Sequence, residues 1–196
     1  DMAVEQTGDG EKEVMDPALV LFDDSRLDEV EVKPEPGAPG PGVREPSLLL
    51  RWPLRMQDWW RQSAYVDLDP NDNAELDYSC MAATYDTHNA NDIALLDFVE
   101  QEEGRFVLAA APGTVIAAID GHFDKQTEVI PGTPANYVKI RHDDGSESWY
   151  WHLKKWSVGV YSGQEVLEGQ AVGMVGSSGL STGSHLHFVV HQDGMD

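Results

Sequence analysis

The sequence predicts an all-β domain, a small antiparallel β-sandwich or barrel, over residues 47–196. Short runs rich in β-branched and aromatic residues recur between glycine-containing turns along this stretch, which is the spacing typical of such folds. The runs at 137–142 and 146–153 pair most plainly, because Asp143-Asp144-Gly145 between them is typical of a hairpin turn.

The other expected elements follow in order along the chain. An apolar run at residues 48–54 opens the domain, and the turn-rich segment 67–73 predicts a solvated loop. Strands are expected at 106–108 and 114–120, ahead of the hairpin, and His142 at the hairpin end is expected on the surface. Isolated apolar residues mark further short strands: Val158, Val160, Val166, Ala171, Val172 and Val175.

Alternation along the second hairpin strand predicts which side chains share a face. Trp149 and Trp151 are expected on one face, and Tyr150 and His152 on the other. We expect the two tryptophans to pack in the core or against another element, and a wall of a substrate cleft is the alternative.

Residues 1–46 are expected to form a separate segment. Their charged side chains are mostly acidic, and residues 33–42 are rich in Pro and Gly, a composition unsuited to a helix or a central strand. This favours a disordered acidic tail or linker. The apolar run at residues 18–22 leaves a second hypothesis open, a pro-segment or docking peptide that covers the functional cleft.

The charge of the chain argues against two classes of partner. Asp and Glu number 35 against 13 Lys and Arg, a net charge of −22. Nucleic acids and anionic lipids are both bound through Lys and Arg, so neither is expected here. The sequence contains no run of about 20 apolar residues, so it does not predict a membrane-spanning helix. Cys80 is the single cysteine, so no internal disulfide can form, and we expect it to be a small buried apolar side chain.

The spacing of histidines predicts a metal site. His185 and His187 lie two residues apart on an expected strand, so their imidazoles share one face and can enter one cleft. His88 and Asp92 lie four residues apart among turn formers, which predicts a loop. Catalytic zinc typically takes three protein ligands and leaves a fourth position for water. His88, Asp92 and one histidine of the pair make such a set. His152, on a third strand, is then free to act on water or substrate.

Four blocks of the sequence resemble the lysostaphin/LytM-type zinc endopeptidases. They are residues 88–94, 109–121, 149–153 and 163–187, and their order and spacing agree with that family across residues 50–196. The resemblance implies a small antiparallel β core of the duplicated hybrid motif type, with loops that form a zinc cleft.

The resemblance also implies a role for each candidate site residue. His88, Asp92 and His187 would bind Zn²⁺, and His152 and His185 would be two unligated catalytic histidines. One would take a proton from water and the other would assist the oxyanion or the leaving amine, in an order that stays open. The implied substrates are peptidoglycan cross-links or glycine-rich proteins, which places the implied site of action outside the cytoplasm, periplasmic or secreted.

One position departs from the family pattern. The family usually has glycine where this chain has Ala90, and alanine tolerates a positive φ poorly. A loop that needs such a φ would loosen His88 or Asp92. An inactive relative, which binds the cell wall or activates another hydrolase, is therefore the alternative function.

Overall fold

The computed structural model describes residues 48–55, 58, 60–71 and 74–192. The expected tail or linker at residues 1–46, with its alternative as a cleft-covering segment, lies outside these residues. Within them, no helix has the length and apolar character needed to cross a membrane.

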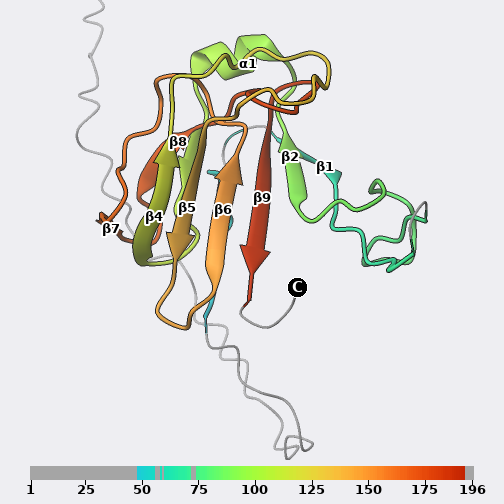
Figure 1. Cartoon of the computed structure of the whole chain (residues 1–196), viewed down its shortest axis with the longest axis horizontal. Coiled ribbons are helices and arrows are strands. Elements are labelled where there is room, and N and C mark those ends of the chain that lie inside the picture. The colour runs from blue at the N-terminus through green and yellow to red at the C-terminus, as the bar shows by residue number, and fades with distance from the viewer. Residues whose placement is uncertain (1–47, 56–57, 59, 72–73, 193–196) are drawn as a thin grey trace, which may run out of the picture. The chain divides into compact units, whose positions relative to one another are not determined.

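The described part of the chain is nearly all β, as the sequence predicts (Figure 1). All pairings between its strands are antiparallel, and they form one large sheet and one strand pair. The large sheet runs, in spatial order, β1 (Arg61–Ala64), β2 (Asn91–Ala94), β9 (His185–His191), β6 (Glu147–Trp151), β5 (Tyr137–Arg141), β4 (Gly113–Ile119) and β7 (Glu165–Val166). The smaller pair is β3 (Phe106–Leu108) and β8 (Ala171–Met174).

The predicted hairpin is β5 and β6. Tyr137 pairs with Trp151 at one end and Arg141 with Glu147 at the other, next to a turn in which Gly145 has φ +88°. Period-2 alternation decides which side chains are buried: Val138, Ile140 and Tyr150 are inaccessible, whereas their neighbours are partly or fully exposed.

Side chains from both sheets form the apolar core. Val107 of β3 and Val172 of β8 belong to the same buried cluster as Val115, Ile140 and Tyr150 of the large sheet. The two sheets therefore enclose one core between them, which fits the predicted sandwich.

The prediction that His142 lies on the surface is wrong. The residue is 4% exposed; its Nδ1 donates to the Pro112 carbonyl at 2.7 Å, and its Nε2 lies 2.9 Å from Ser148 Oγ. The Ser148 hydroxyl continues the chain to Tyr150 OH, which accepts from Ala110 N at 2.7 Å. A buried histidine is stable here because both ring nitrogens have polar partners.

The single helix among the described residues, α1 (Phe98–Glu103), has no counterpart in the sequence prediction. The Asp97 side chain caps its first turn by accepting from Val99 N and Glu100 N. Gln101 is fully buried, donates to the Asp124 carbonyl at 2.9 Å, and accepts a hydrogen bond from the hydroxyl of Ser184. The helix is thereby tied to the residue that precedes β9.

Cys80 is exposed, so the prediction of a buried apolar cysteine is also wrong. Its loop is organised by a carboxylate instead. Asp77 is 2% exposed and accepts from the Ser79 hydroxyl and from the backbone N–H groups of Met81 and Ala83. Because hydrogen bonds to the Asp77 carboxylate hold this loop together, it needs no buried apolar side chain at position 80.

Candidate metal centre

The pairing of β2 with β9 brings the polar residues of two distant segments together. Asp92 lies opposite His187, and Ala94 lies opposite His185. Directly paired residues in an antiparallel ladder project on the same face, as do residues two apart on one strand. Asp92, His185 and His187 therefore share one face of the large sheet, as the spacing of the two histidines predicts.

His88 reaches this face from the loop that precedes β2, as predicted, but the loop prediction is wrong for Asp92, which lies on β2. Its Nδ1 lies 2.7 Å from the Tyr65 carbonyl. A carbonyl can only accept, so Nδ1 carries a proton and Nε2 is the nitrogen that faces the site. Ala90 is buried, and its φ is not positive, so alanine fits this loop without backbone strain.

The three candidate ligands converge on one point. Asp92 Oδ1 lies 3.2 Å from His88 Nε2 and 2.9 Å from His187 Nδ1, and the two imidazole nitrogens are 3.4 Å apart. One nitrogen or oxygen atom from each residue lies within 4.8 Å of the others, a spacing that could hold a metal ion. His88 and Asp92 are almost fully buried, at 3% and 6% exposure.

The Asp92 carboxylate and the histidines beside it stabilise one another's charged forms. Burial raises the pKa of the Asp92 carboxyl, but hydrogen bonds from His187 and His88 outweigh burial and hold that pKa well below its usual range. Burial likewise opposes protonation of His88, and the Asp92 carboxylate and the Tyr65 carbonyl overcome it and raise the pKa of His88. Metal binding would therefore displace protons from the histidines while leaving the carboxylate ionised.

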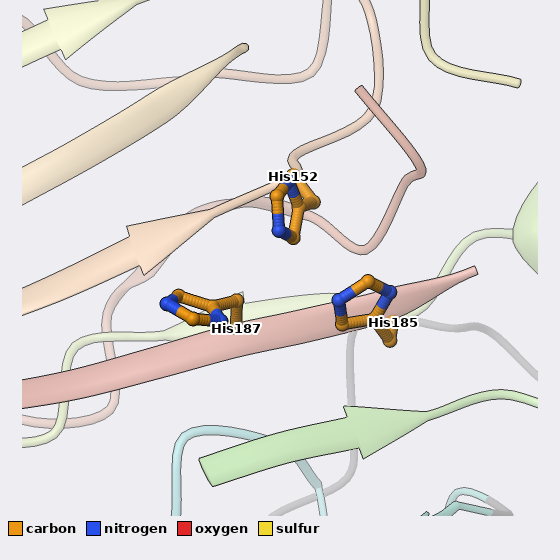
Figure 2. A group of neighbouring side chains, drawn as sticks. All are labelled: His152, His185 and His187. Atoms are coloured by element: carbon orange, nitrogen blue, oxygen red, sulfur yellow. The ribbon is translucent and has the colours of Figure 1, made fainter. Parts of the chain in front are cut away.

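His152 faces the same space from the end of β6. Its ring centroid lies 4.6 Å from that of His185 and 5.4 Å from that of His187. Figure 2 shows the three rings facing one another, with His152 opposite the two histidines of β9. A second group of possible metal-binding atoms thus consists of His152, His185 and His187.

Strand alternation does not hold at His152. The strand ends at Trp151, and His152 has a left-handed φ of +64°, which turns its side chain out of the predicted alternation. Trp151 and His152 consequently line the same cavity instead of opposite faces. The cleft wall, which was the alternative for the tryptophans, applies to Trp151.

A buried hydrogen-bond network fixes this unusual backbone. Leu153 N donates to the Asn136 carbonyl at 3.0 Å, and the Leu153 carbonyl accepts from Asn136 Nδ2 and Ser178 Oγ. The Ser178 carbonyl accepts from His152 Nδ1 at 2.6 Å, which leaves the lone pair of His152 on Nε2. Burial, with the nearby imidazoles of His185 and His187, lowers the pKa of His152 to about 3, so its ring is neutral near pH 7.

His185 is held in the same way. Its Nδ1 donates to the Gly183 carbonyl at 2.8 Å, and its Nε2 lies 3.8 Å from Asp92 Oδ1. Burial lowers the pKa of His185 and outweighs the opposing effect of the Asp92 carboxylate. Two neutral imidazoles, each with Nε2 free to accept a proton, therefore stand beside the possible metal ligands.

The five residues border a cavity of about 570 Å³. Tyr85, which sequence reasoning missed, also lines it: the phenol ring stacks on His88 at 4.1 Å between centroids, and its OH lies 3.4 Å from Asp92 Oδ2. Burial and the Asp92 charge raise the pKa of Tyr85, so the phenol keeps its proton as a donor. Nothing in the spacing of a lone tyrosine could have shown this contact.

Comparison with known families decides the family of the chain. Residues 94–196, more than half of the sequence, match the sequence profile of peptidase family M23. The chain belongs to peptidase family M23. His152, His185 and His187 fall inside the matched residues, whereas His88 and Asp92 precede them and are brought to the same site by the fold.

Individual relatives of this M23 chain cover parts of it. Peptidoglycan DD-endopeptidase ShyA of Vibrio cholerae is 43% identical over 53 residues, 27% of this chain and 12% of that protein. Glycyl-glycine endopeptidase ALE-1 of Staphylococcus capitis is 45% identical over 54 residues, 27% of this chain and 14% of that protein. The chain thus spans a small fraction of the length of these curated relatives.

A solved structure supports the fold. A chain in the SpoIIQ–SpoIIIAH pore forming complex superposes with a TM-score of 0.52 at 22% identity, covering 75% of this chain and 85% of that one. This likeness concerns the fold alone. Together with the M23 match it confirms the predicted family and the all-β fold class.

Proposed function

We propose that this M23 chain is a zinc metalloendopeptidase that hydrolyses peptide bonds of peptidoglycan cross-links or glycine-rich proteins. The observation that carries the proposal is the convergence of His88 Nε2, Asp92 Oδ1 and His187 Nδ1 beside two further imidazoles with free Nε2 atoms. A site of action outside the cytoplasm, periplasmic or secreted, follows from the substrate class.

The proposed ligands fit zinc by their chemistry. Two imidazole nitrogens and one carboxylate oxygen are a common set of protein ligands for catalytic Zn²⁺, which keeps a further position open. The hydrogen bond from His88 Nδ1 to the Tyr65 carbonyl is the outer contact that ligating histidines usually make. Zn²⁺ held there would supply a Lewis acid that polarises a carbonyl oxygen and makes water more acidic.

We assign the proton transfers to His152 and His185. Each ring donates through Nδ1 to a backbone carbonyl, so only Nε2 can accept a proton from water. A ring that has accepted this proton can pass it to the amine nitrogen when the peptide bond breaks. The neutral state of both rings near pH 7 suits proton acceptance.

The relatives support the substrate class. One is named a peptidoglycan DD-endopeptidase and another a glycyl-glycine endopeptidase. The alternative, an inactive relative, rested on Ala90, and the buried Ala90 with its negative φ gives that alternative no support. All five candidate residues are present and face the same cavity.

The test is the release of new amino groups from purified peptidoglycan and from a glycine-rich protein, with and without a zinc chelator. We expect amines to appear, to vanish with chelator and to return when Zn²⁺ is restored. The His152→Ala variant serves as the matched control, because it should retain zinc yet release amines at least about 10²-fold more slowly. A zinc-loaded protein that releases no amines from either substrate would overturn the proposal.

A further inference from the structure

The cleft continues past the metal centre towards the β1 edge of the large sheet. A second hollow, of about 450 Å³, is lined by residues from β1, β2, the start of α1 and the loop before β9. It shares Asp92, Thr182 and His185 with the first cavity. A peptide bound across the metal centre can therefore extend into both hollows.

The strand register places Arg61 in line with a proposed catalytic histidine. Arg61 pairs with Ala94 on β2, and Ala94 pairs with His185 on β9, so the three residues form one row across the sheet. Directly paired residues project on the same face. Two strand spacings, about 10 Å in all, separate the Arg61 and His185 backbones. The small side chain of Ala94 lies between them in the lining of the hollow.

Arg61 is the one cation in this part of the cleft. Among the described residues that line either hollow, no other is Lys or Arg. Its guanidinium makes no hydrogen bond or ion pair with the described part of the chain, unlike Arg105 and Arg141, which pair with glutamates. Arg51 and Arg55 likewise have no ion pair with the described residues, but neither lines a hollow, so Arg61 is distinguished by its position.

The acidic residues of the second hollow are already engaged. Asp97 Oδ1 accepts from the backbone N–H groups of Val99 and Glu100 at the start of α1. Asp92 is held by its histidines at the metal centre. Neither carboxylate forms an ion pair with the Arg61 guanidinium, so the positive charge of Arg61 is available to a ligand.

We propose that Arg61 is a specificity-determining residue that binds a free carboxylate of the peptide substrate, about one to three residues from the bond that is cut. The proposal rests on the peptidase function proposed above and names its substrate class more closely. An extended peptide advances about 3.4 Å per residue, so three residues span the distance between the Arg61 and His185 backbones. Guanidinium matches a carboxylate with two parallel hydrogen bonds, which an amide cannot accept equally.

The carboxylate can belong to a side chain or to the end of the peptide, and three probes separate these sources. Each is N-acetylated tetraglycine extended by one residue: glutamate with an amidated end, glutamine with an amidated end, or glutamine with a free end. A second glutamate/glutamine pair carries the extra residue at the amino end. We expect kcat/KM for at least one carboxylate probe to exceed that for its uncharged partner about tenfold, as for a partly exposed charge-assisted contact.

Variants assign the preference to the guanidinium. Arg61→Ala should lose the preference for the carboxylate probe while cleaving the uncharged probe at the wild-type rate. Arg61→Lys should retain part of this preference, and Arg61→Glu should reverse it. Arg141→Ala is the matched control: it removes the same charge from a residue paired with Glu147, outside both hollows, and should leave the preference intact. The preference should also weaken as ionic strength rises.

Binding measurements keep this inference separate from the peptidase proposal. Dissociation constants for the same probes are measured on zinc-loaded His152→Ala protein, with and without Arg61→Ala. Equal affinity for charged and uncharged probes, or a preference that survives Arg61→Ala, overturns the role of Arg61 whether or not the wild type cleaves them. A carboxylate preference in binding without cleavage by the wild type would support Arg61 and count against the peptidase.

Discussion

Asn136 offers the sharpest test of how the fold holds His152. The Asn136 side chain is fully buried and makes three hydrogen bonds: Oδ1 accepts from His122 N at 2.8 Å, and Nδ2 donates to the carbonyls of His122 and Leu153, both at 3.0 Å. Asn136→Ala removes all three. Because Leu153 follows His152 directly, the loss of its hydrogen bond from Asn136 loosens the backbone that positions the His152 imidazole.

The expected loss of stability follows from these contacts. A hydrogen bond contributes about 0.5–1.5 kcal/mol net, and more is lost where a buried partner is left unpaired. Leu153 O keeps its bond from Ser178, and His122 is only partly buried and can turn to water. We therefore expect the free energy of unfolding to fall by about 1.5–3 kcal/mol, the lower part of the range that three such hydrogen bonds would give together. For a chain of this size, that corresponds to a fall in Tm of about 3–12 °C.

Activity should fall as well, and this separates positioning from stability. The left-handed backbone of His152 is disfavoured by about 1–2 kcal/mol without support, so a loosened Leu153 lets the ring move away. We expect kcat to fall about 10- to 100-fold with zinc content and KM little changed, measured well below the Tm of the variant. Calorimetry, metal analysis and steady-state kinetics make the assay, and Asn71→Ala, at an exposed loop residue, is the control. A lower Tm with unchanged kcat would refute the link between Asn136 and His152.

Three further predictions test the ligands, the core and the loop at Asp77. His187→Ala should lose stoichiometric zinc, whereas His152→Ala should keep it, as metal analysis after dialysis will show; zinc retained by the first variant would remove His187 from the ligand set. Tyr150→Phe should lower the free energy of unfolding by about 1–3 kcal/mol, because a buried backbone N–H loses its acceptor, and denaturant titration at unchanged zinc content checks this. The Ser79 side chain and backbone N–H groups lower the pKa of Asp77 to about 2, below its ordinary 3.8. Its stabilising effect is thus present above about pH 4 and is lost as the pH falls towards 2, so the protection of residues 78–83 from hydrogen exchange, relative to the intrinsic rate at each pH, should fall over that window in the wild type and vary less in Asp77→Asn.

Much of the fold was predictable because its signals are local. Period-2 alternation and an Asp-Gly turn define β5 and β6 from a few consecutive residues. The same period puts His185 and His187 on one face without knowledge of any other strand. Helix α1 was not predictable in this way, since six residues carry less than two turns of pattern and the helix depends on Asp97 as its cap.

The burial of single polar residues could not be predicted from their neighbours in sequence. His142 follows a strand, where exposure is common, but the distant Pro112 carbonyl and the Ser148 hydroxyl on the partner strand satisfy both ring nitrogens. Cys80 is exposed because Asp77 closes that loop through backbone N–H groups. In both cases distant or backbone partners decide the outcome, and neither has a side-chain signature.

The proton-accepting geometry of the site rests on the backbone and not on conspicuous side chains. The rings of His88, His152 and His185 each donate Nδ1–H to a carbonyl, those of Tyr65, Ser178 and Gly183, and in each ring Nε2 is then the nitrogen that faces the site. Every residue has a carbonyl, so a sequence cannot show which ones will serve, although it shows the histidines themselves. His187 differs, because its Nδ1 faces Asp92 and must give up its proton to bind a metal. The chain therefore fixes which nitrogen of His88, of His152 and of His185 faces the site before a metal arrives, whereas the protons that His88 and His187 share with Asp92 have to leave when one binds.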